Sequence, residues 1–161
     1  PDASQRSHLV NEFLAELFAD VNVLEAAVAL PTTDLQACLH GFIGTPQYAA
    51  LHNPVYSAIS NPWAVTFRNC NEFVLDVLHA AIYRRNDVGR LKAIARTYFV
   101  PHTLEVNPLR LFFGTLTLPD VHTIDHHDGE LRMATYGSLV SYLEQCDLLA
   151  EQFVLRGEDI R

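Results

Sequence analysis

The segment RNCNEFVLDVLHAAIY, residues 68–83, constrains the fold most, because it joins a capped helix start to a long apolar helix face. Asn69 is a favoured N-cap residue, and Glu72 follows three positions later, which is the spacing of a capping box. A helix is therefore predicted to begin at Cys70 and to end near Arg85. One broad face of this helix is apolar and has to pack against another element, through Phe73, Val74, Val77, Leu78, Ala81 and Ile82.

Cys70 would occupy the first position of this helix, between Asn69 and Asn71. The unpaired backbone N–H groups and the helix dipole stabilise an anion at such a position, and the thiolate is the reactive form of cysteine. Nucleophilic cysteine enzymes combine this arrangement with a histidine base. The alternative is a buried structural thiol, because free cysteine is among the most buried residue types. Cys38 is expected to be such a buried thiol, within its own helix.

Histidines are the candidates for the base, and the chain has 8 of them. His52 precedes a proline turn, and His122 lies in the stretch DVHTIDHHDGE, residues 120–130. Both are predicted as possible bases for Cys70. His79 is expected on the polar side of the Cys70 helix, more than two turns from the cysteine and too far to serve.

The stretch at residues 120–130 also raises the question of a metal site. Two histidines with flanking carboxylates resemble a ligand set, at His122, Asp125, His126 and Asp128. Their spacing matches no specific metal motif, and a polar hairpin that turns at Asp128–Gly129 explains the same residues. We therefore predict neither a metal nor a cofactor.

The other segments mix helices with strands and give a prediction of the α+β class as one domain, residues 1–161. Helices are predicted at 7–21, 31–44, 86–99 and 137–153, with one helical turn at 108–114. Strands or extended segments are predicted at 22–30, 55–60, 102–106 and 115–125. The last helix would place five residues on one face: Leu139, Leu143, Cys146, Leu149 and Phe153.

Composition and charge exclude several classes of function. A net charge of −8 without a run of basic residues argues against a nucleic-acid partner. Three cysteines without a CxxC pair cannot form a disulfide framework. No apolar run reaches the roughly 20 residues of a membrane span, and no signal segment opens the chain. The sequence starts at Pro1, so it is expected to be a processed product or a piece of a longer polypeptide.

Three stretches together resemble a known bacterial family: residues 51–82, 95–106 and 116–144. Their motif residues are His52, Pro54 and Tyr56, then Pro62 and Trp63, then Asn69, Cys70 and Asn71, with a partial match at Asp125, His126, His127 and Asp128. The family is DUF2145, a domain of unknown function, and the resemblance extends from about Leu9 to Leu143. Its members vary between Ser and Cys at the position of Cys70.

This resemblance implies a circularly permuted NlpC/P60 or papain-like fold. The chain would be the C-terminal portion of such a domain, with helices packed on a small antiparallel sheet. The family's usual N-terminal region, with a Ser-His strand segment that would supply the base, would be missing here. Members commonly look exported, which implies a periplasmic or cell-envelope location.

Two functions follow as expectations. The first is a papain-like thiol hydrolase or acyltransferase, in which Cys70 attacks an amide or ester and backbone N–H groups hold the oxyanion. The alternative is a non-catalytic papain-like module that binds partners or serves a structural role in a multi-chain assembly. Missing strands would expose a sheet edge and an apolar face. The expected partner is therefore a second protein chain or the chain's own N-terminal segment, and a homo-oligomer is also open.

Overall fold

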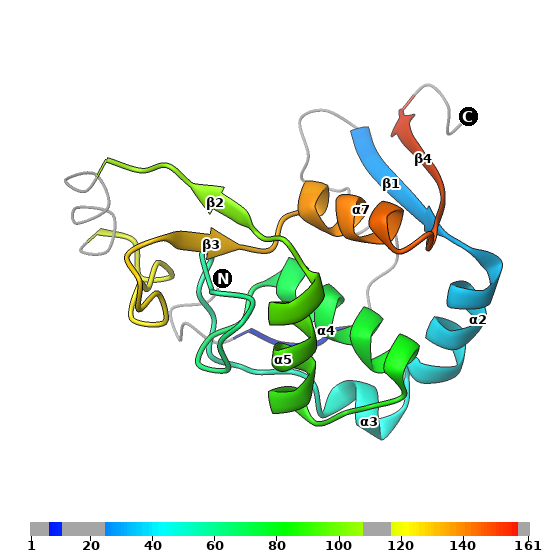
Figure 1. The fold of residues 1–161 in the computed structure, drawn as a ribbon, viewed down its shortest axis with the longest axis horizontal. Helices are drawn as coiled ribbons and strands as arrows, with labels where there is room; N and C mark the ends of the chain where they lie inside the picture. Colours follow the sequence, from blue (N-terminus) through cyan, green and yellow to red (C-terminus); the bar gives the residue numbers. More distant parts are fainter. Residues whose placement is uncertain (1–6, 11–24, 108–116, 158–161) are drawn as a thin grey trace.

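Helix α4, Cys70–Tyr83, is the central element of the computed structural model, which describes residues 7–10, 25–107 and 117–157 (Figure 1). The helix begins at the predicted residue, because the Asn69 side chain caps it and accepts a hydrogen bond from the Glu72 backbone N–H. It ends at Arg84, whose left-handed backbone (φ 52°) stops the helix. Both ends are therefore set by local chemistry.

Three further helices contact α4: α2, Thr33–Phe42; α5, Val88–Tyr98; and α7, Tyr136–Gln145. A short helix, α3, Pro46–Ala49, connects α2 to the long loop before α4. Asp87 caps α5 through the backbone N–H of Arg90, and Thr135 forms a capping box with Ser138 at the start of α7. The predictions of helices at 31–44 and 86–99 are confirmed.

Two small antiparallel sheets complete the described part of the fold. Strand β1, Glu25–Pro31, pairs with β4, Leu149–Arg156, and strand β2, His102–Leu104, pairs with β3, Leu131–Met133. Figure 1 shows the two sheets on either side of α7. The α+β class is confirmed, whereas the papain-like permutation stays a prediction.

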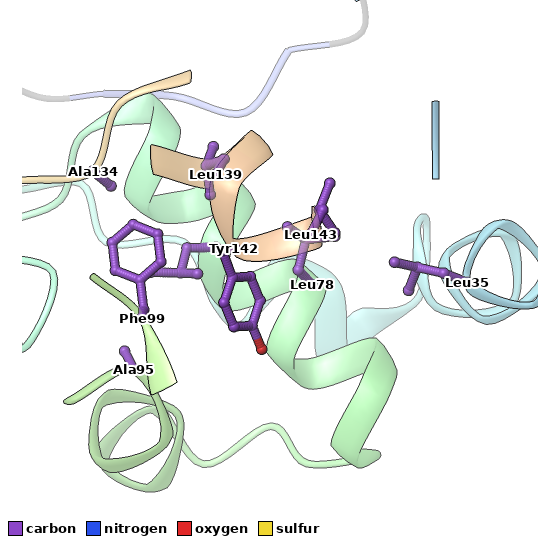
Figure 2. Close-up of a cluster of buried hydrophobic side chains, with 9 residues drawn as sticks. Leu35, Leu78, Ala95, Phe99, Ala134, Leu139, Tyr142 and Leu143 are labelled. Carbon is purple, nitrogen blue, oxygen red and sulfur yellow. The ribbon is translucent and has the colours of Figure 1, made fainter. Parts of the chain in front are cut away.

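In the described part of the chain, the core consists of two clusters of buried side chains around α4. The larger cluster joins α4 to α2, α5 and α7 (Figure 2) through Leu35, Leu75, Leu78, Ala95, Phe99, Ala134, Leu139, Tyr142 and Leu143. Within it the rings of Phe99 and Tyr142 meet edge to face, with centroids 5.9 Å apart. The smaller cluster contains Leu51, Val77, Ala80 and Leu91. Each fully buried leucine contributes roughly 1.5–3 kcal/mol, so these clusters supply much of the folding free energy.

The C-terminal segment differs from the prediction of one helix through Phe153. Helix α7 ends at Gln145, and Asp147 adopts a left-handed backbone (φ 55°) that reverses the chain into β4. Strand β4 is fixed by pairing with β1, which is distant in sequence, so that helical periodicity alone could not predict it. The predicted helix at 7–21 and the helical turn at 108–114 fall mainly outside the described residues.

Two other local predictions are corrected. The segment 117–125 turns at Pro119–Asp120 and again at Ile124–Asp125, so it is not continuously extended. A turn with a positive φ at Gly129 does precede β3. However, β3 pairs with the distant strand β2 and not with the residues directly before the turn. Asp128–Gly129 therefore does not close a hairpin.

Candidate functional site

Cys70 is the first residue of α4 and is exposed to solvent. Among the described residues, the backbone N–H groups of Cys70 and Asn71 have no hydrogen-bond acceptor, whereas the third N–H of the turn, that of Glu72, is bound by the Asn69 cap. Two donors are therefore available beside the thiol. Cys38 and Cys146 are exposed as well, so the expected burial of Cys38 is wrong.

Tyr56 is the aromatic neighbour of this thiol. An isolated parallel bridge joins Tyr56 to Arg68, two residues before Cys70. Burial raises the pKa of the Tyr56 hydroxyl, and the nearby Cys70 and Asp120 raise it further. A tyrosine hydroxyl is protonated at neutral pH even at its ordinary pKa of about 10, so Tyr56 can donate a hydrogen bond beside Cys70.

His52, the first predicted base, is engaged by the N-terminal residues. Its Nε2 lies 3.0 Å from the Ser7 hydroxyl, and its ring meets the Phe73 ring edge to face at 6.5 Å. Burial lowers the pKa of His52, and the neighbouring His8 and Arg68 lower it further. The imidazole is therefore neutral at pH 7, the form that accepts a proton.

His122, the second predicted base, is held by other contacts. Its ring stacks on the buried Phe67 ring with centroids 4.8 Å apart, and its backbone N–H donates to the Ser57 hydroxyl. Within the described part of the chain, neither His122 nor His52 hydrogen-bonds the Cys70 thiol. The assignment of either histidine as the base stays a prediction.

A buried cluster of four charged side chains lies directly behind the start of α4. Lys92 of α5 donates to Glu72 Oε1 at 2.5 Å and to Asp76 Oδ2 at 2.9 Å, and Arg68 pairs with the same two carboxylates. All four side chains are at most 4% exposed. Two positive and two negative charges make the cluster neutral, which is the condition for burying charged groups without a large penalty.

Glu72 therefore has a different role from the one that the capping-box spacing suggests. Its second oxygen accepts a hydrogen bond from the buried Ser60 hydroxyl, so the carboxylate is directed inward and not toward the backbone of Asn69. Desolvation lowers the pKa of Lys92 to about 8, although Glu72 opposes the shift. Desolvation likewise lowers the pKa of Arg68.

His79 belongs to the same buried side of α4, and its predicted polar exposure is wrong. The side chain is 0% exposed and its ring lies 5.3 Å from that of Tyr142. Burial, together with the positive charge of Lys92, lowers the pKa of His79 to about 4, although the Leu91 backbone opposes part of the shift. Positions 68, 72, 76 and 79 recur at helical spacing, which indicates that their side chains form one polar stripe along α4. The sequence alone could not show that this polar stripe is buried.

The side chains of the stretch at 120–130 form hydrogen bonds to another part of the protein and do not form a set of metal ligands. Asp125 accepts the Asn61 backbone N–H at 2.8 Å, and His126 Nε2 lies 2.8 Å from the Ile59 carbonyl oxygen. Among the described residues, no group of three or more His, Cys, Asp and Glu side chains is placed to hold a metal ion. These bonds join the 120–130 stretch to the loop at 57–61, which in turn contacts Asn69.

The chain belongs to DUF2145, a family described as uncharacterised proteins conserved in bacteria, whose sequence pattern matches residues 1–143. No curated protein and no solved structure matches the chain. None of the described helices has both the length and the apolar character that crossing a membrane requires.

Proposed function

We propose that this protein is a thiol hydrolase or acyltransferase with Cys70 as its nucleophile. The observation that carries the proposal is the exposed thiol at the first position of a capped helix, with two unbonded N–H groups beside it. The buried charge cluster supports the proposal because Lys92 of α5 pairs with Glu72 and Asp76 of α4 and so fixes the start of the helix that carries Cys70. By the same family resemblance, the proposed reaction would take place in the periplasm or cell envelope.

The chemistry begins with the Cys70 thiolate adding to the carbonyl carbon of an ester or amide, which forms a C–S bond. The carbonyl oxygen becomes an oxyanion, and the N–H groups of Cys70 and Asn71 are the donors for it. Collapse then breaks the C–O or C–N bond, and the leaving group takes its proton from the protonated base, for which His52 and His122 are the candidates. Water, or an acceptor alcohol or amine, cleaves the thioester and restores the thiol.

The test is the rate at which iodoacetamide alkylates each cysteine of the intact protein, followed by peptide mass spectrometry. Cys38 and Cys146 serve as internal controls because all three thiols are exposed. We expect Cys70 to react faster than both controls below neutral pH. His52→Gln and His122→Gln then identify the base, because only replacement of the true base should remove that advantage. Equal rates at the three thiols would refute an activated Cys70.

A non-catalytic module in a multi-chain assembly is the second candidate. Two observations favour it: no histidine bonds the Cys70 thiol among the described residues, and no residue of β1 or β4 is buried. A two-stranded sheet is marginally stable without further packing. Equal alkylation of the three cysteines would therefore leave this candidate as the better function.

A further inference from the structure

An apolar pocket opens between the two core clusters, along the α4 face that begins at Cys70. Its volume is about 340 Å³, and β1, α2, α3, α4 and α7 all contribute to its walls. The side chains come from both clusters, for example Leu78 and Leu139 from the larger and Val77 from the smaller. The pocket is thus a concave gap left between two packed cores, and its size falls in the range of small-molecule sites.

The position of Cys70 relative to this pocket follows from helix geometry. The lining residues of α4 include Phe73, Val74, Val77 and Leu78. These positions lie three, four, seven and eight residues after Cys70, so they share its face of the helix. Helical side chains also lean toward the N-terminus, which directs Phe73 and Val74 toward the turn of Cys70. The thiol therefore stands at one end of the apolar face, about 6 Å along the axis from Val74.

The side chains that line the pocket indicate which class of ligand it can bind. No Asp, Glu, Lys, Arg or His side chain lines the pocket among the described residues, although the chain is rich in acidic groups. Apolar side chains also remain exposed at two lining positions, Val74 at 45% and Ile43 at 52%. A pocket of this composition favours a hydrocarbon and offers no charged partner to a peptide backbone or a sugar.

We propose that this pocket binds the acyl chain of the substrate and so presents its carbonyl to Cys70. The proposal rests on the proposed function for the role of Cys70, but the pocket itself is defined independently of catalysis. It names the substrate class as long-chain acyl esters, thioesters or amides. Chain binding should strengthen by about fourfold for each buried methylene, which corresponds to about 0.8 kcal/mol.

The experiment uses N-alkyl iodoacetamides of increasing chain length, from ethyl to octyl, on the intact protein below their micelle concentrations. Each reagent forms a C–S bond and expels iodide, so no turnover is needed. We expect the octyl reagent to alkylate Cys70 at least tenfold faster than the ethyl reagent, whereas Cys38 and Cys146 change less than twofold. A Cys70 ratio equal to those of the other two thiols would overturn the pocket proposal.

Two variants at exposed lining positions sharpen the test, because neither should disturb folding. Val74→Glu and Ile43→Glu should each reduce the octyl-to-ethyl ratio at Cys70 by at least threefold. Val100→Glu is the matched control, since Val100 is 69% exposed and lies outside the pocket, and it should leave the ratio unchanged. Because the ratio is taken within one thiol, it stays informative even if plain iodoacetamide shows that Cys70 is not activated. The two proposals can therefore fail separately.

Discussion

Replacement of His79 by Phe should make the protein less sensitive to acid. The wild-type imidazole is 0% exposed and packs against the rings of Tyr83 and Tyr142. Burial lowers the pKa of His79 from 6.5 to about 4. In the unfolded chain the imidazole therefore binds a proton near pH 6.5, whereas in the folded chain it does so only near pH 4. Between these values the unfolded state holds more protons, so stability falls as the pH falls.

The size of this effect follows from the two pKa values. At pH 4.5 the His79 contribution to the free energy of unfolding should be smaller by about 2.5 kcal/mol than at pH 8. Phe has a similar shape and leaves no polar partner unsatisfied, so His79→Phe should cost little at pH 8. The variant should then lose about 2.5 kcal/mol less than wild type on acidification.

Urea unfolding followed by circular dichroism at pH 8, 6 and 4.5 measures the difference. The comparison of variant with wild type removes the contributions of the carboxylates, which are common to both. His79→Leu provides a second apolar replacement, in case the Phe ring does not fit between Tyr83 and Tyr142. Equal losses of stability in wild type and in both variants would refute the conclusion that His79 is buried as a neutral imidazole.

Two further substitutions test the support of the α4 start. Lys92→Met should destabilise the fold by about 3–5 kcal/mol in urea unfolding at pH 7, because it leaves Glu72 and Asp76 buried with only Arg68 as a cation. Arg90→Met on the exposed side of the same helix is its control, and a loss as large as that of Lys92→Met would contradict the assignment. Asn69→Ala should cost about 1 kcal/mol through the lost cap, seen as a shift of the unfolding midpoint, whereas Asn69→Ser should retain most of it. An unchanged midpoint in Asn69→Ala would contradict the role of the cap.

Sequence alone predicted those parts of the fold that local chemistry determines. The start of α4 follows from Asn69, and the α5 cap follows from Asp87. Strand β4 could not be predicted in this way, because the apolar residues after Gln145 continue the helical spacing while the structure pairs them with β1. The residue with the left-handed backbone after α7 is Asp147 and not a glycine, so the sequence contains no glycine that would mark this end of the helix.

The candidate site also has features that local sequence predicts and features that only the packing of distant segments determines. The position of the thiol at a helix start could be predicted from two adjacent residues, Asn69 and Cys70, whereas its exposure is known only from the structure. The burial of Glu72 and His79 could not, because α4 is covered on its polar stripe as well as on its apolar face. A charged stripe on a helix ordinarily faces water, and only the packing of α5, with Lys92, turns it into part of the interior.

The buried polar stripe of α4 connects the candidate nucleophile, through Glu72, to residues that are distant in sequence. Glu72 binds Lys92 of α5 through one oxygen and Ser60 of the preceding loop through the other, while Asn69 holds its backbone N–H. Helix α5 and the preceding loop are thereby fixed to the first turn of α4, in addition to the helix's own cap, at a residue two positions from Cys70. Removal of Lys92 or Ser60 would leave the buried Glu72 carboxylate incompletely satisfied, whereas removal of the Asn69 side chain would leave the Glu72 backbone N–H without its acceptor. Because Glu72 is part of the helix backbone that carries the thiol, the geometry at Cys70 depends on α5 and the loop as much as on its own cap.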